Sequence, residues 1–228
     1  MNARARRNLT SARRRLPALV LMLVVVALCV AGVIYKGAEV TQVNVNDGGI
    51  WVTNKSKQMV GHLDYEARIL DGALHTEASN FDVGQAGETV TVSDLSSLTV
   101  APVNVTQVAL GSPTALPSGS IAMQGGDVLG VLNATDGTLW TTSATTPSPA
   151  NLSDNAAVAS NMGASAFVTG MDGTVYSLSS FGSLTTVKRQ GAVDQAKTSM
   201  IEGIPADASL SMTAVGDQVV ALDSTSNT

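Results

Sequence analysis

A pattern of short apolar segments and glycine turns recurs through most of this 228-residue chain at intervals of about 40 residues, and it constrains the fold more than any other feature. In each copy, an apolar segment leads into a glycine-containing turn, and a second apolar segment follows that turn. The turn glycines of the five copies are Gly49, Gly87, Gly126, Gly163 and Gly216. The second segments are residues 50–52, 89–92, 128–132, 166–168 and 218–222. Their shortness and their Val, Ile and Thr content predict β-strands.

A third apolar segment follows in the first four copies, at residues 59–63, 99–103, 138–140 and 174–178. Two of the turns before it are Asp136-Gly137 and Asp172-Gly173, a pair that favours a tight hairpin because both positions tolerate positive φ. Hairpin repeats of this length are typical of β-propeller blades, which gain stability by packing on one another. A β-sandwich also has closely spaced strands. The constant order of strands and turns favours an all-β, propeller-like fold with about four complete blades and a broken fifth.

Two irregularities qualify the repeat. The interval between the last two marker glycines is the longest, which predicts an insertion over residues 188–204. There Ala192, Ala196 and Met200 recur every four residues, as in a short amphipathic helix, and a long loop is the alternative. The sequence also ends in the turn after residues 218–222, so its last copy lacks a return strand. This ending predicts a fragment of a longer protein, or a truncated product.

The N-terminal segment predicts a membrane anchor. Residues 16–35 carry no charge, and a helix of that length rises about 30 Å, the thickness of the hydrocarbon core. Six arginines precede the run and Lys36 follows it, so the N-terminus is expected in the cytoplasm. The run is longer than the apolar part of a cleavable signal peptide, and the large Leu28 disfavours a lipoprotein at Cys29. The predicted organisation is a basic cytoplasmic tail (1–15), one transmembrane helix (16–35) and an extracytoplasmic domain (36–228) at the cell membrane.

Charge and cysteine content exclude several functions for that outer domain. Residues 1–36 contain seven basic residues and no acidic residue. Residues 37–228 therefore contain six basic and 18 acidic residues, a net charge of −12. Nucleic-acid binding is excluded, because phosphate neutralisation needs clustered Lys and Arg. The single cysteine, Cys29, lies in the apolar run, so the outer domain has neither a disulfide nor thiolate chemistry.

Three short segments resemble a known family. Residues 45–54, which contain Asp-Gly-Gly-x-Trp-Val-x-Asn, together with residues 60–64 and 81–83, are similar to the start of actinobacterial membrane-anchored proteins with fibronectin type III or Ig-like domains. The resemblance covers residues 16 to about 110 and implies an N-terminal transmembrane helix, a propeller-like region and a cell-surface role. The family's fibronectin type III domains are absent from this sequence. The family carries no catalytic motif, so the resemblance assigns no functional residue.

Individual residues suggest no active site. His62 and His75 lie beside neither a cysteine nor another histidine, so they are expected as surface or strand residues rather than metal ligands. Five aspartates offer oxygen ligands for calcium, but without the Asp-x-Asp-x-Asp-Gly spacing they are expected in turns; they are Asp47, Asp64, Asp71, Asp82 and Asp94. Trp51 and Trp140 could stack on a sugar, although packing between blades is the favoured role. No catalytic, cofactor or metal site is predicted.

These observations favour a non-enzymatic scaffold or binding module on the cell surface, anchored by a single membrane span. A cell-wall or surface protein, or a glycan, is the expected partner. The alternative is the propeller part of an extracellular polysaccharide-acting or quinone-dependent enzyme whose catalytic residues lie outside this chain. A signalling receptor is a third possibility, but the 15-residue basic tail is too short to fold and would need a partner.

Overall fold

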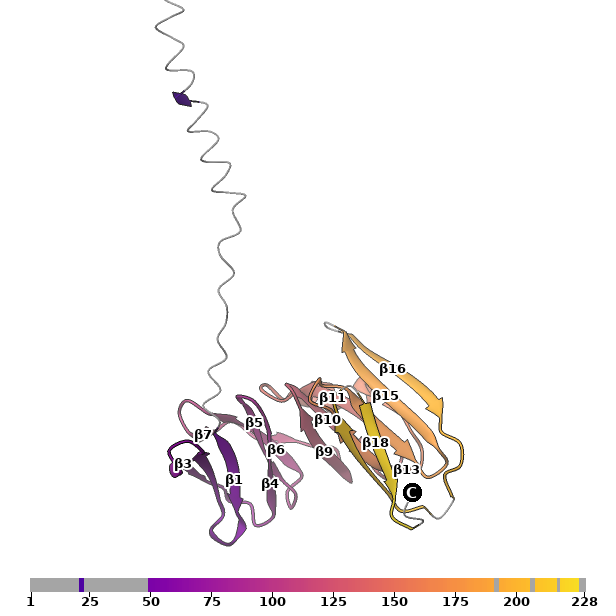
Figure 1. Ribbon diagram of the computed structural model, residues 1–228, viewed down its shortest axis with the longest axis horizontal. Helices are drawn as coiled ribbons and strands as arrows, with labels where there is room; N and C mark the ends of the chain where they lie inside the picture. Colours follow the sequence, from indigo (N-terminus) through magenta and orange to yellow (C-terminus); the bar gives the residue numbers. More distant parts are fainter. Residues whose placement is uncertain (1–20, 23–48, 191–192, 206–207, 217, 226–228) are drawn as a thin grey trace, which may run out of the picture. The chain divides into compact units, whose positions relative to one another are not determined.

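A computed structural model describes residues 21–22, 49–190, 193–205, 208–216 and 218–225 (Figure 1). The chain divides into two compact units, Met1–Val45 and Asn46–Thr228. In the first unit only Leu21 and Met22 are described, and both are helical. The remainder of the predicted span 16–35 therefore lies outside the described residues. Within the described part of the chain, no helix has the length and apolar character needed to cross a membrane.

The second unit consists of antiparallel sheets, so the all-β prediction is confirmed. The first sheet contains β1 (Ile50–Asn54), β2 (Met59–Asp64) and β3 (Ile69–His75). The second contains β4 (Phe81–Ala86), β5 (Thr89–Asp94) and β6 (Thr99–Asn104), with β7 (Ala109–Leu110) and β8 (Thr114–Ala115) both paired to β6. The third contains β9 (Ser120–Gly125), β10 (Val128–Asn133), β11 (Thr138–Ser143) and β12 (Ala159–Ser160).

The fourth sheet contains β13 (Ala164–Thr169), β14 (Val175–Ser179), β15 (Ser183–Gln190) and β16 (Val193–Met200). The last contains β17 (Leu210–Val215) and β18 (Gln218–Asp223). Three 3-10 turns are η1 (Lys55–Lys57), η2 (Pro149–Leu152) and η3 (Asp154–Ala156). Strands β1, β4, β9, β13 and β17 contact one another in that order, so each sheet packs on the next along the chain.

Apolar side chains fill the spaces between successive sheets. Trp51 and Val60 of the first sheet pack with Phe81 of the second. In β10, alternate side chains point to opposite faces. Leu129 belongs to the core shared with the second sheet, and Leu132 belongs to the core shared with the fourth. A central strand that is buried on both faces is what a stack of blades requires.

Two glutamines link neighbouring sheets in the same way. The Gln124 amide on β9 donates to the Thr89 carbonyl (2.9 Å) and accepts from the Thr91 hydroxyl (2.6 Å), both on β5. The Gln85 amide on β4 donates to the Gly49 carbonyl (3.0 Å) and accepts from the Trp51 N–H (2.9 Å). Because Gln85 bonds to β1 as Gln124 bonds to β5, β1 corresponds to β5, which is the second strand of the second sheet. That agrees with the prediction for residues 50–52, whose expected first strand lies before residue 49 and outside the described residues.

A polar side chain at the end of each second strand marks the repeat more reliably than the glycines do. Each of these side-chain oxygens accepts an N–H from the turn that comes next, which is the ordinary Asx or Ser turn. The residues are Asn54, Asp94, Asn133, Ser179 and Asp223. They lie at the ends of β1, β5, β10, β14 and β18.

The predicted strand order of the fourth copy is wrong by one strand. Residues 159–160 form β12, which pairs with β11 as the outer strand of the third sheet. Residues 166–168 lie in the first strand of the fourth sheet, β13, and residues 174–178 lie mainly in its second strand, β14. The turn that matches Gly87 and Gly126 therefore contains Gly173 rather than Gly163. All four glycines have positive φ, so a glycine signal alone does not distinguish one turn of a blade from another.

The predicted helix or loop within residues 188–204 is also wrong for most of that segment. Strands β15 and β16 pair over eight residues, from Ser183 opposite Met200 to Gln190 opposite Val193. The four-residue spacing of Ala196 and Met200 fits alternate positions of a strand as well as it fits a helix. Pairing along β15, which is itself held by β14, decides between the two.

Candidate functional site

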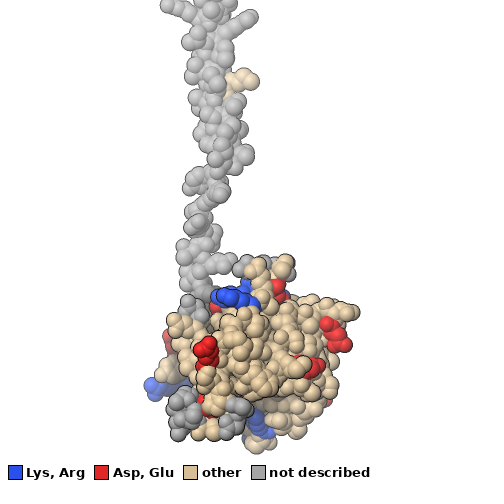
Figure 2. Space-filling view, turned by 90° about the vertical axis from the view of Figure 1, so that its right-hand side faces the viewer, with Lys and Arg blue, Asp and Glu red and all other residues tan. Residues whose placement is uncertain are grey.

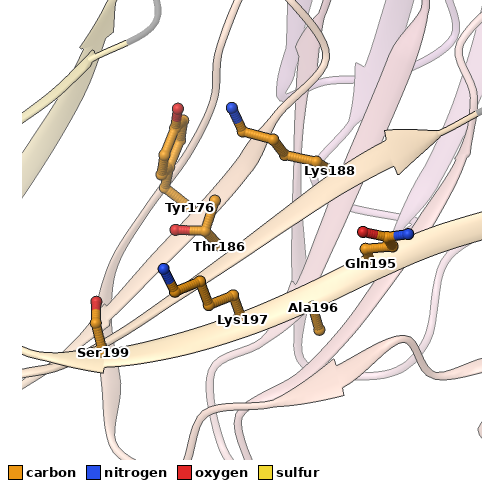
Figure 3. Close-up of a pocket in the computed structure, with 7 residues that line it drawn as sticks. All are labelled: Tyr176, Thr186, Lys188, Gln195, Ala196, Lys197 and Ser199. Atoms are coloured by element: carbon orange, nitrogen blue, oxygen red, sulfur yellow. The ribbon is translucent and has the colours of Figure 1, made fainter.

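The outer half of the fourth sheet carries a recess of about 430 Å³ that is lined mostly by residues with polar groups. Its lining comes from β14, β15 and β16 and consists of Tyr176, Thr186, Lys188, Gln195, Ala196, Lys197 and Ser199 (Figure 3). Cross-strand pairing explains why most of these side chains meet on one face. Thr186 lies opposite both Tyr176 and Lys197, and Lys188 lies opposite Gln195. Residues that are paired, or two apart on a strand, project from the same side of a sheet.

The opposite face of the hairpin is anchored to the third sheet. The Thr141 hydroxyl on β11 donates to the Asp194 carboxylate. The Arg189 Nε also donates to this carboxylate, at 3.3 Å. Arg189 and Asp194 each neighbour a recess residue in sequence, so they project from the other side of the sheet. The charged pair thus fixes the base of the recess without placing a carboxylate in its lining.

Two lysines give the recess its charge. Figure 3 shows Lys188 and Lys197 on either side of Thr186, with Tyr176 beside them. Within the described residues, the ion pairs are His62–Asp71 and Arg189–Asp194, and neither includes these two lysines. Figure 2 views the domain from the side of β15, β16 and β18 and shows a largely uncharged surface with separate charged groups. Local positive charge is therefore scarce, and part of it is concentrated here.

The positive charge of Lys188 lowers the pKa of one carboxylate near the recess. The pKa of Asp172, in the turn between β13 and β14, lies below its ordinary value. Partial burial acts to raise this pKa, but hydrogen bonds from the Thr174 hydroxyl (2.7 Å) and N–H (3.0 Å), together with the positive charge of Lys188, outweigh it. Asp172 already has its own hydrogen-bond donors and does not line the recess.

The residues singled out in the sequence do not converge on a second site. His62 Nδ1 lies 2.6 Å from Asp71 Oδ1, and the His62 ring lies 5.2 Å from that of Trp51. His75 is exposed on β3. Asp64 and Asp94 accept turn N–H groups, Asp82 accepts the Val83 N–H, and Asp47 lies outside the described residues. Among the described residues, no three His, Cys, Asp or Glu side chains gather as a metal site would require.

The tryptophans pack between sheets, which confirms the favoured prediction. Trp51 is 6% exposed in the core between the first and second sheets. Trp140 is 2% exposed, and its Nε1 donates to the Ser153 carbonyl at 2.9 Å. Sequence reasoning missed the recess, although one signal was present. Lys188, Arg189 and Lys197 are half of the six basic residues in 37–228.

Comparison with known proteins identifies the fold only. No family model matches the sequence, and neither does any curated protein. Among solved structures, the dihydro-heme d1 dehydrogenase NirN in complex with DHE is 12% identical, with a TM-score of 0.51 over 81% of this chain and 43% of that one. The N-terminal domain of Nup159 is 11% identical, with a TM-score of 0.50 over 77% of this chain and 50% of that one.

Both neighbours are β-propeller proteins. The fold is propeller-like. The chain spans half or less of the length of these two solved structures. At such low identity the similarity concerns the packing of blades and carries neither ligand nor activity to this chain.

Proposed function

We propose that the chain is a non-enzymatic binding or scaffold module, held at the outer side of the cell membrane by its N-terminal segment. The observation that carries this proposal is the stack of packed, propeller-like sheets, with the recess on the β15–β16 hairpin as the candidate binding face. The recess volume of about 430 Å³ falls within the roughly 300–1,000 Å³ usual for ligand pockets. Rigid blades that present variable loops and hairpins are well suited to recognition.

The character of the lining supports binding rather than catalysis. Hydroxyl, amide and ammonium groups line the recess, and no histidine or carboxylate is among them. Histidine is the side chain most often used for general acid–base chemistry, and carboxylates, Lys and Tyr also serve. The His62–Asp71 pair lies in the first sheet and contributes nothing to the lining of this recess.

The membrane location rests on the sequence. An uncharged run at 16–35 is preceded by six arginines, an arrangement that retains the N-terminus in the cytoplasm and exports the residues after the run. The acidic, cysteine-free composition of residues 37–228 is compatible with an exported domain. The expected partner is accordingly a component of the cell surface, either a protein or a glycan.

The test blocks the recess without changing its charge. The full chain, purified in detergent, is mixed with isolated cell-envelope material, and the retained fraction is measured. Ser199→Trp places a large side chain in the recess and is expected to lower retention. Met200→Trp adds similar bulk at the neighbouring position, which is exposed and does not line the recess, and is expected to retain wild-type behaviour.

Equal retention of the two variants would contradict a binding role for this face. Turnover by the wild-type chain in panels of hydrolase and oxidoreductase substrates would contradict the non-enzymatic assignment and favour the enzyme alternative.

A further inference from the structure

We propose that β16 pairs edge to edge with β16 of a second copy of this chain, so that two four-stranded sheets join into one across a two-fold axis. This self-association uses the backbone groups along the outer edge of β16. It is therefore independent of the recess and goes beyond the proposed function.

The outer edge of β16 lacks the devices that protect other outer strands of this chain. A strand edge presents unpaired N–H and C=O groups, and proteins blunt such edges with very short strands, bulges, prolines or charges. The second and third sheets end in two-residue strands, β7, β8 and β12. In the first sheet, the register between β2 and β3 skips Asp71, which forms a bulge and bonds to His62. Strand β16 instead runs for eight residues in unbroken register with β15 and contains no proline.

Alternation along the hairpin shows which backbone groups of β16 face outward. The Ile201 N–H donates to the Gly182 carbonyl at 2.8 Å, directly after the last strand pair, Ser183 opposite Met200. Hydrogen-bonded and non-hydrogen-bonded pairs alternate along antiparallel strands. The backbone groups of residues 193, 195, 197 and 199 therefore face β15, and those of residues 194, 196, 198 and 200 face outward. Within the described residues β16 pairs with β15 alone, and Figure 1 shows it on the outer side of the fourth sheet.

A second, antiparallel copy of β16 satisfies these outward groups. Under a two-fold axis, each outward N–H meets a carbonyl of the partner and the reverse holds too, so the edge is complementary to itself. The side chains along the strand permit this approach. All of them except Asp194 are exposed, and the Asp194 carboxylate is already bound by Arg189 and Thr141 of its own copy. Lys197 is the one other charged side chain of the strand.

Lys197 decides the register of the pair. Pairing centred on Lys197 would set the two lysines directly opposite each other, and opposed like charges destabilise a strand pair. Pairing centred on Ala196 places each Lys197 opposite the partner's Gln195, and small alanine side chains meet at the axis. It still pairs residues 193–199, whereas pairing centred on Thr198 would use only residues 196–200 of the strand. We therefore expect Ala196 at the two-fold axis.

The oligomeric state of the full chain in detergent micelles tests the pairing, measured by sedimentation equilibrium at matched solvent density. We expect the wild-type chain to form a dimer. Thr198→Pro removes an outward N–H that does not bond to β15, and it is expected to raise the dimer dissociation constant at least about tenfold. Thr198→Ala removes the same hydroxyl, which lies 3.2 Å from that of Thr185, but keeps the N–H and should associate as the wild type does. Circular dichroism and the thermal unfolding midpoint verify that both variants are folded.

Cysteine crosslinking tests the register and decides the matter even if the proline variant fails to fold. The single native cysteine is first removed by Cys29→Ser. Opposed residues of a hydrogen-bonded pair have Cα atoms about 5.5 Å apart, a separation that a disulfide spans. Ala196→Cys is therefore expected to give a disulfide-linked dimer on mild oxidation. Thr198→Cys is the matched control and should not crosslink, because in this register each Thr198 lies opposite the partner's Asp194.

Three outcomes would overturn the inference. The first is a wild-type chain that remains monomeric. The second is equal association of Thr198→Pro and Thr198→Ala, which would place the contact of any dimer elsewhere. The third is a failure of Ala196→Cys to crosslink more than Thr198→Cys does.

Discussion

At the scale of single residues, side-chain hydrogen bonds to the backbone join one sheet to the next. Gln85 and Gln124 occupy the same place on the first strands of two consecutive sheets, and each bonds to the second strand of the preceding sheet. Thr169 on β13 makes a related link, from its hydroxyl to the Met123 carbonyl on β9 (2.9 Å). Polar groups between sheets therefore help to set the order and register of packing, which apolar contacts alone would leave less specific.

Gln124→Ala tests this role. The substitution removes hydrogen bonds to the Thr89 and Gly126 carbonyls and leaves the Thr91 hydroxyl without its acceptor. We expect a loss of about 2–3 kcal/mol in the free energy of unfolding, because partly buried polar groups lose their partners. Urea unfolding of the full chain in detergent, followed by tryptophan fluorescence, measures it. The exposed Gln107→Ala should change stability by less than about 0.5 kcal/mol, and similar values for the two variants would refute the role.

Acid sensitivity also arises at this scale. The pKa values of Asp94 and Asp172 both lie below the ordinary value. Partial burial raises them, but hydrogen bonds from Ser97 and Ser96 to Asp94, and from Thr174 to Asp172, lower them more. A carboxylate with a lowered pKa in the folded state stabilises the fold above its unfolded pKa, about 3.9, and loses that contribution as pH falls through the folded value.

The expected result is therefore a decrease in stability as the pH falls below about 4. Asp94→Asn keeps an oxygen acceptor for the turn but cannot titrate, so part of the decrease should disappear. Urea midpoints at several acidic pH values measure the effect. Asp154→Asn, at an exposed position, is the control. An unchanged pH profile for Asp94→Asn would show that this turn does not contribute to acid unfolding.

At the scale of elements, the blade hairpins depend on turns that only some residues can adopt. Gly87 and Gly137 both have positive φ, 59° and 77°. Their surroundings differ. A Cβ added at Gly87 would meet nothing within 4 Å, whereas one at Gly137 would lie 2.1 Å from the Asn161 carbonyl oxygen. Asn161 is itself buried and bonded to the Ser177 and Ser183 carbonyls, so it cannot move away freely.

Comparing alanine substitutions at these two glycines distinguishes the energetic cost of backbone strain, which both share, from the cost of a steric clash, which only Gly137 has. Gly87→Ala should cost about 1–2 kcal/mol, the penalty of a left-handed conformation for a residue with a Cβ. Gly137→Ala should cost clearly more, because the third and fourth sheets would have to shift around Asn161. Thermal unfolding of both variants gives the comparison. Equal costs would mean that the turn at Gly137 relaxes without disturbing the neighbouring sheet.

The β15–β16 hairpin shows how one element can extend beyond the repeat. Its strands have eight residues, whereas the first strands of the second, third and fourth sheets have six. Val187 of β15 is buried in the core shared with the third sheet, whereas every side chain of β16 except Asp194 is exposed. The hairpin therefore has one strand that belongs to the packed domain and one strand that is exposed.

At the scale of the whole molecule, each sheet gains its stability mainly from its neighbours. The described cores lie between the first and second sheets, the second and third, and the third and fourth. Repeat architectures of this kind have stabilities that depend on nearest-neighbour interfaces. The exposed residues Lys188 and Lys197 lie outside these cores, so they can be changed without disturbing the interfaces.

Membrane topology gives the prediction at this scale. The full chain, with an epitope at its N-terminus, is produced in bacterial cells that are then converted to spheroplasts. External protease should digest the domain of residues 36–228 and leave the N-terminal epitope protected until the membrane is permeabilised. Digestion of the epitope in sealed spheroplasts would reverse the predicted orientation. A mature protein whose measured mass lacks residues 1–31 would instead indicate cleavage of a signal peptide.

The local features of this protein follow from its sequence alone. Strand-length apolar segments, Asp-Gly and glycine turns, and a recurring interval predict an all-β, propeller-like chain, and they place strands β5, β6, β10 and β18 close to their observed positions. The packing role of Trp51 and Trp140 is predictable too, because each lies at an inward position of a repeated strand. These features depend on backbone preference and side-chain alternation, which act over a few residues.

Pairing between distant strands is decided only in the tertiary structure. Residues 159–160 join the third sheet because β11 offers a free edge, and residues 193–200 are a strand because β15 pairs with them. The recess needs three strands in one register before Tyr176, Lys188 and Lys197 share a face. Register is a property of several segments at once, and no short stretch of sequence contains it.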